Sequence, residues 1–226
     1  MSSGLYTQLL DLACGAFLLA AVIVLWRHEL AALVRAFALQ GVALAAIAVF
    51  LGGHEERWDL IAVGLGIGVL RAGVLPYLMR RALAALAADR GSEEVRETQP
   101  LVNVAASLLT AALLTLLAYA VGRPLTRLDP TPAAHALPVG LAVVLIGFFV
   151  LATRRRALAQ VVGFLLLDNG ITATAFLATS GVPLIVELGV SFDVLLAVLV
   201  LQILTTRMRE AFGTTDIDDL RELHDR

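Results

Sequence analysis

The chain has 226 residues, of which 59% are hydrophobic and 16% charged, and its formal net charge is −2. Because soluble domains carry about 25% charged residues, this composition predicts an integral membrane protein. A net charge this small points to no class of partner, and no nucleic-acid partner is expected. A single cysteine, Cys14, excludes an internal disulfide and a thiolate metal cluster, and the four histidines lack the close spacing of a metal site.

Seven apolar segments are long enough to cross a bilayer, since about 20 helical residues span about 30 Å of hydrocarbon. Lipid offers no water to open backbone groups, so these segments should be helices packed as a bundle. The sequence therefore predicts an all-α, polytopic membrane helix bundle with about seven transmembrane helices. The predicted spans are residues 5–26, 30–52, 59–80, 101–121, 136–153, 157–179 and 183–206.

Arginines between the spans fall unequally on the two sides of the membrane. One side holds three, and the other holds twelve; the first set is Arg57, Arg123 and Arg127, and the second is Arg27, Arg80, Arg81, Arg90, Arg96, Arg154, Arg155, Arg156, Arg207, Arg209, Arg221 and Arg226. Because cytoplasmic loops collect positive charge, we expect the N-terminus outside and the C-terminus in the cytoplasm. Termini on opposite sides of the membrane require an odd number of spans, and the seven predicted spans meet this requirement.

Two polar loops divide the chain. The loop at 87–100 is polar, and the loop at 122–138 is rich in proline. We therefore predict a four-helix membrane region at 1–134, a three-helix membrane region at 135–207 and a charged cytoplasmic tail at 208–226.

The third span carries Arg71 near the bilayer centre, followed by Pro76, which removes a backbone donor and releases the carbonyl of Ala72. A buried cation needs an anion, so Arg71 should pair with an intramembrane acid. Such a pair could form part of a proton relay, or it could be a static salt bridge that holds the bundle together. The sequence leaves both possibilities open.

Three acids lie in the last two spans: Asp168, Glu187 and Asp193. Insertion measurements put a charged side chain at the bilayer centre at roughly 2.5 to 3.5 kcal/mol, so such residues persist mainly at functional or paired positions. Asp168 and Thr172 share one helix face, although a hydrogen-bonded packing role would also explain them. Asp193 is near mid-depth, and Glu187 lies close enough to the external end to reach interfacial water.

The motifs LLLDNG (165–170) and VELGVSFD (186–193), with the tail RMREAFGTTDIDDLRELHDR (207–226), resemble hydrogenase-4 membrane component E. In its last three helices that family is similar to the small K subunit of complex I and the C subunit of cation/proton antiporters. The resemblance puts Asp168 at the acid of the family's E-N-G sequence, one methylene shorter, and matches Asp193 to the third-helix glutamate of the K subunit. Glu187 matches the family's V-E-[IL]-G, and Arg71 with Pro76 resembles a family Lys and Pro.

The resemblance implies a non-redox, membrane-arm subunit of an energy-converting nickel-iron hydrogenase complex of the hydrogenase-4 or formate hydrogenlyase type. Its buried carboxylates would contribute to proton translocation in a bacterial cell membrane, beside antiporter-like subunits and hydrogenase subunits. The nickel-iron centre and iron-sulfur clusters would belong to those partners, and neither a cofactor nor an active site is expected in this chain. A structural scaffold subunit and a small subunit of a multi-subunit cation/proton antiporter are the alternatives.

Overall fold

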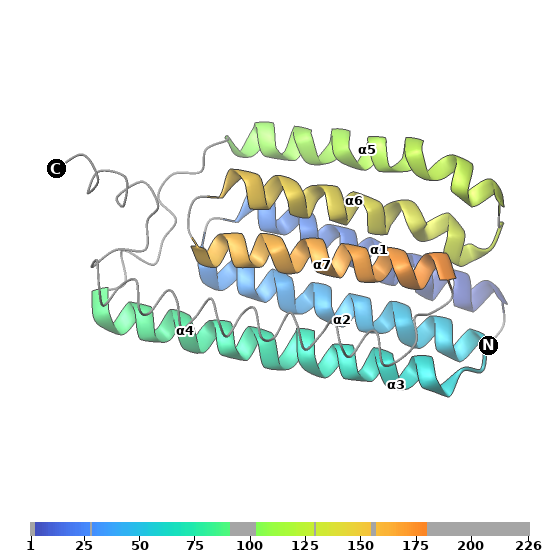
Figure 1. The fold of residues 1–226 in the computed structure, drawn as a ribbon, viewed down its shortest axis with the longest axis horizontal. Coiled ribbons are helices and arrows are strands. Elements are labelled where there is room, and N and C mark those ends of the chain that lie inside the picture. The colour runs from blue at the N-terminus through green and yellow to red at the C-terminus, as the bar shows by residue number, and fades with distance from the viewer. Residues whose placement is uncertain (1–2, 28, 91–102, 129, 155–156, 180–226) are drawn as a thin grey trace.

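The computed structural model describes residues 3–27, 29–90, 103–128, 130–154 and 157–179. They form long helices laid side by side (Figure 1). The helices are α1 (Ser3–Trp26), α2 (Leu30–His54), α3 (Trp58–Ile67), the π-helical η1 (Gly68–Val74), α4 (Leu75–Arg90), α5 (Val104–Leu128), α6 (Pro132–Thr153) and α7 (Ala157–Thr179). Because α3, η1 and α4 follow one another without a break, they act as one long element.

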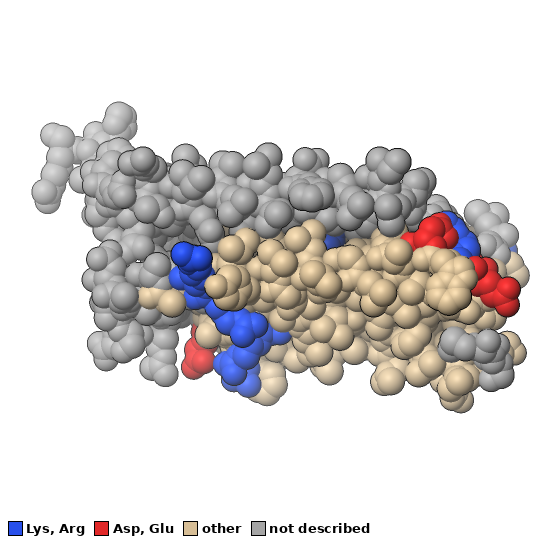
Figure 2. All heavy atoms as spheres, turned by 90° about the horizontal axis from the view of Figure 1, so that it is seen from below, with Lys and Arg blue, Asp and Glu red and all other residues tan. Residues whose placement is uncertain are grey.

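Six helical segments of the described residues are long and apolar enough to cross a membrane. They correspond to the first six predicted spans, and the seventh, at 183–206, lies outside the described residues. On the face seen in Figure 2, a broad surface with few charged side chains lies between two groups of charged residues. The all-α class is thus confirmed, with six candidate membrane-spanning helices, whereas the count of seven spans, the orientation and the three-region division remain predictions.

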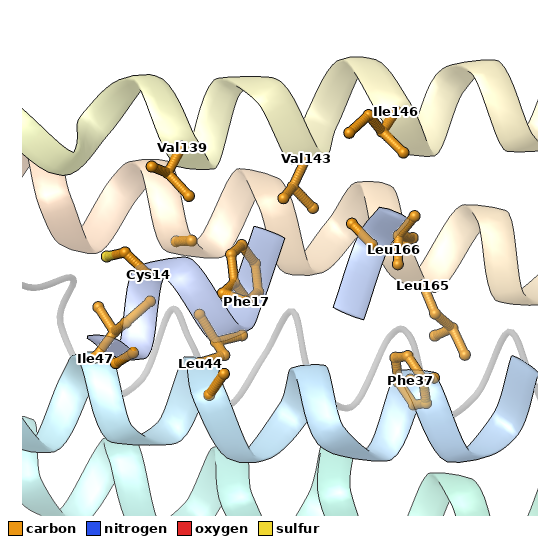
Figure 3. Packing of buried hydrophobic residues seen from close by; sticks show 14 of the residues in the cluster. Cys14, Phe17, Phe37, Leu44, Ile47, Val139, Val143, Ile146, Leu165 and Leu166 are labelled. Atoms are coloured by element: carbon orange, nitrogen blue, oxygen red, sulfur yellow. The ribbon is translucent and has the colours of Figure 1, made fainter. Parts of the chain in front are cut away.

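The helices pack as a bundle in which α2 and α6 occupy central places. α2 contacts α1, α3, η1 and α7, and α6 contacts α7, α5 and α1. Figure 3 shows side chains of α1, α2, α6 and α7 meeting in one interior; Phe17, Phe37, Leu44, Val143, Ile146 and Leu166 are all buried there. Since lipid is as apolar as leucine, helix association in the bilayer relies on close packing and on interhelical hydrogen bonds.

Glycines bring α6 and α7 into backbone contact. A Cβ added to Gly147 of α6 would lie 2.6 Å from the backbone nitrogen of Leu167, and one added to Gly170 of α7 would lie 2.6 Å from that of Val144. Seven residues earlier in each helix, a Cβ at Gly140 would lie 2.8 Å from the backbone nitrogen of Thr174, and one at Gly163 would lie 2.9 Å from that of Leu151. Small residues at these positions let two membrane helices approach each other closely.

The loop expected at 122–138 is much shorter in the structure. α5 continues through Pro124 to Leu128, and α6 already begins at Pro132. A proline near the end of a helix displaces one carbonyl without ending the helix, and at the first helical position its missing N–H costs nothing. The hydroxyl of Thr131 accepts a hydrogen bond of 3.2 Å from the backbone N–H of Ala134 and caps α6.

Candidate functional site

The third span changes its helical winding where Arg71 lies. Residues Gly68–Val74 wind as a π-helix, and the backbone N–H of Leu75 donates to the carbonyl of Leu70, five residues back. Pro76 contributes to this widening, because its ring cannot donate and clashes with the carbonyl four residues before it. Single π-helical turns inside α-helices occur frequently at functional sites.

Arg71 is 1% exposed and reaches from η1 to α7. A terminal nitrogen of its guanidinium, Nη2, lies 2.8 Å from Oδ2 of Asp168, and the same nitrogen donates a 3.2 Å hydrogen bond to the hydroxyl of Thr172. Its other terminal nitrogen, Nη1, donates to the side-chain oxygen of Asn169. One cation is therefore held by one carboxylate and two neutral acceptors, all from a single turn of α7.

A further hydrogen bond joins this group to α2. The amide nitrogen of Asn169 donates to Oε1 of Gln40 at 2.9 Å, and both side chains are fully buried. The bond fixes the orientation of the Asn169 amide, whose oxygen consequently faces Arg71. We call the five residues that meet here the Arg71 cluster: Gln40, Arg71, Asp168, Asn169 and Thr172.

Gly41, next to Gln40, explains how α2 comes near enough. A Cβ at Gly41 would lie 2.8 Å from the carbonyl carbon of Arg71 and 2.9 Å from the backbone nitrogen of Ala72. No side chain larger than hydrogen fits between the two backbones without a shift. The glycine therefore sets the distance at which Gln40 can reach Asn169.

The charges of Arg71 and Asp168 balance within the cluster. A guanidinium keeps its proton in proteins, whereas a carboxylate can take one up and release it. Asp168 is 9% exposed, more than any other member, so it lies at the margin of the cluster while Gln40, Arg71 and Asn169 are sealed. The arrangement can accordingly hold one exchangeable proton beside a fixed cation.

The structure brings together two of the four predicted site residues. It pairs Arg71 with Asp168 and puts Thr172 on the same face of α7, whereas Glu187 and Asp193 lie outside the described residues. The role of Gln40 was not foreseen, although a lone amide inside the apolar run FALQGVAL was a usable signal.

In the described ranges, no three or more histidine, cysteine, aspartate or glutamate side chains gather closely enough to hold a metal ion. The Arg71 cluster itself offers one carboxylate beside a permanent cation, which would repel a metal ion.

Six helices long and apolar enough to cross a membrane, packed around a buried ion pair, indicate a multi-pass helical membrane protein. The chain belongs to the family of uncharacterized protein Rv0085 of Mycobacterium tuberculosis, to which it is 52% identical over 225 residues, the full length of both chains. No family model matches the chain, and no solved structure matches it.

A more distant similarity extends to hydrogenase-4 component E. The Escherichia coli K12 protein is 27% identical over 187 residues, which cover 83% of this chain and 84% of that protein, and the Shigella flexneri protein gives the same figures. The similarity thus covers most of the chain.

Proposed function

We propose that this chain is a non-redox membrane subunit of an energy-converting hydrogenase complex, in which its buried carboxylates take part in proton translocation. The observation that carries the proposal is the buried pair between Arg71 and Asp168 at 2.8 Å. The distant similarity to hydrogenase-4 component E supports the type of complex. The bacterial cell membrane is the proposed location, with antiporter-like and hydrogenase subunits as partners that hold the metal centres.

The chemistry of the cluster suits a proton relay. When Asp168 takes up a proton, its ion pair with Arg71 is lost, but Asn169 and Thr172 continue to accept hydrogen bonds from the guanidinium. The cation is therefore not left bare in a medium where an unpaired charge costs several kcal/mol. Both the protonated and the ionised form of the Asp168 carboxyl group are therefore accessible, as a proton relay requires.

The test is Asp168→Asn in the assembled complex, with proton translocation measured in membrane vesicles during hydrogenase turnover. We expect translocation to be lost while hydrogen turnover with an artificial electron acceptor persists. Asp59→Asn is the matched control, because Asp59 pairs with Arg57 at an exposed position and its loss should leave translocation unchanged. Normal translocation in Asp168→Asn would contradict the relay.

Glu187 and Asp193 remain proposed members of the same path. Both lie outside the described residues, so they are tested by substitution alone. Asp193→Asn should abolish translocation as Asp168→Asn does, while Glu187→Gln should have a smaller effect if its side chain reaches interfacial water.

A scaffold role is the second candidate, and one observation favours it. Arg71 is held by three side chains of α7, and Asn169 ties α7 to α2, so the cluster joins three parts of the bundle. If this is its main role, Asp168→Asn should deplete the whole complex on native gels. Loss of assembly before any transport defect would thus favour the scaffold.

A further inference from the structure

One face of α1 carries polar and small residues on the outside of the bundle. Gly4, Gln8, Asp11 and Gly15 are all exposed. At about 100° per residue they fall within roughly 60° of one another, so they form a single stripe along the helix. We call these four residues the α1 stripe.

Of the four residues in the α1 stripe, Asp11 is the one whose side chain costs the most free energy to place in a bilayer. It lies eight residues after the start of α1, about 12 Å along the axis at 1.5 Å per residue. Acids within membrane helices normally face a partner or a cavity. Among the described residues, nothing forms a hydrogen bond or an ion pair with Asp11.

The two glycines leave bare backbone on either side of Asp11. A Cβ at Gly4 or Gly15 would meet no atom within 4 Å, unlike the glycines between α6 and α7. Beside the stripe stand the large side chains of Leu12, 71% exposed, and Leu19, 57% exposed. Interfaces between membrane helices are enriched in small residues, because these let two helix backbones approach closely.

The sequence limits what could neutralise Asp11 from within this chain. In the predicted spans, apart from their ends, the basic residues are Arg35 and Arg71. Arg71 belongs to its cluster, and Arg35 donates to the carbonyl of Ala31 near the start of α2, which packs beside the far end of α1. The predicted seventh span, 183–206, contains no basic residue at all.

We propose that the α1 stripe is the docking surface for a transmembrane helix of a partner subunit that places a Lys or Arg side chain against Asp11. This proposal rests on the proposed function, membership of a membrane complex. Charge complementarity selects the occupant: a second copy of this chain would bring one Asp11 toward another, and lipid tails would leave the carboxylate unpaired. The partner helix packs against the glycines and supplies a cation that none of the described residues places against Asp11.

The experiment is site-specific photo-crosslinking in the native membrane. A benzophenone amino acid replaces Leu12, which borders the stripe without belonging to it, or Leu116, a 70% exposed residue of α5, as the control. We expect the probe at position 12 to form an adduct with a membrane helix that contains a Lys or Arg, identified by peptide mass, and Asp11→Leu to abolish that adduct. Asp11→Glu should preserve it, because the charge remains.

A charge exchange completes the test. Asp11→Lys should lose the adduct, and replacing the identified partner's basic residue with Asp in the same cells should restore it. Adducts with lipid alone at position 12, or an unchanged adduct in Asp11→Leu, would overturn the proposal. If an adduct forms with a basic helix but no hydrogenase-type subunits co-purify, the docking surface stands and the proposed function fails.

Discussion

The buried pair between Arg71 and Asp168 predicts an asymmetric and strongly coupled response to substitution. Arg71→Leu leaves a carboxyl group that can become neutral by taking up a proton, whereas Asp168→Leu leaves a guanidinium that cannot lose its charge. Removing one partner of a buried pair typically costs about 3 to 5 kcal/mol in stability. We therefore expect Asp168→Leu to lie at the upper end of that range and Arg71→Leu at or below its lower end.

The double substitution should cost far less than the sum of the two single ones. With both charges gone, no uncompensated ion remains, and Asn169 keeps its hydrogen bond to Gln40. Replacing a whole buried pair by apolar residues is often close to neutral. With one single substitution near 5 kcal/mol and the double near neutral, the coupling between the two positions should be at least about 3 kcal/mol, which is the high end for contacting residues.

The assay is a double-mutant cycle on the purified protein in detergent micelles, unfolded by increasing mole fractions of a denaturing detergent. The exposed pair between Arg57 and Asp59 is the control, and we expect no measurable coupling there, since solvent screens it. Additive costs for Arg71→Leu and Asp168→Leu would refute the reasoning. They would show that the contribution of each side chain to stability does not depend on the other.

Three further predictions use the same unfolding assay. Gly41→Ala should destabilise the protein by about 1 to 3 kcal/mol, because the added methyl group would overlap the backbone of Arg71. Gly66→Ala is its control: a Cβ at Gly66 meets nothing within 4 Å, so better helix propensity should leave stability unchanged or raise it by up to about 1 kcal/mol. Arg154→Met should cost about 1 to 3 kcal/mol, since the guanidinium is buried and donates to backbone carbonyls at the end of α1. Equal stabilities of Gly41→Ala and Gly66→Ala would contradict the close approach of α2 to η1.

Much of the fold could be predicted from the sequence, because hydropathy alone marks where a helix must cross the bilayer. The first six spans appear where the apolar segments predicted them. The helix α5, however, continues beyond the end of its apolar segment and through Pro124. Proline near a helix end permits either a loop or a further turn, and sequence alone does not decide between them. The π-helical winding around Arg71 was equally hidden, because a proline such as Pro76 disturbs the turn before it without deciding whether the helix ends, kinks or widens there.

The candidate site could be predicted in part, for a different reason. The cost of burying Arg71 required an anion, but three acids were available, and the choice of Asp168 depends on how α7 is placed against η1. Gln40 and Asn169 carry no charge, so no energetic argument singled them out before their hydrogen bond was visible. Uncharged residues that orient a charged one are found through contacts rather than composition.

The contact between α6 and α7 limits where water can enter the bundle. With glycine backbones of one helix lying against the other at Gly140, Gly147, Gly163 and Gly170, this interface has no width for a file of water molecules. The polar turn of α7 that holds Asp168 faces α2 and η1 instead. A hydrated route to Asp168 would therefore follow the side of α7 that faces α2 and η1. The close contact between α6 and α7 would exclude water from the opposite side.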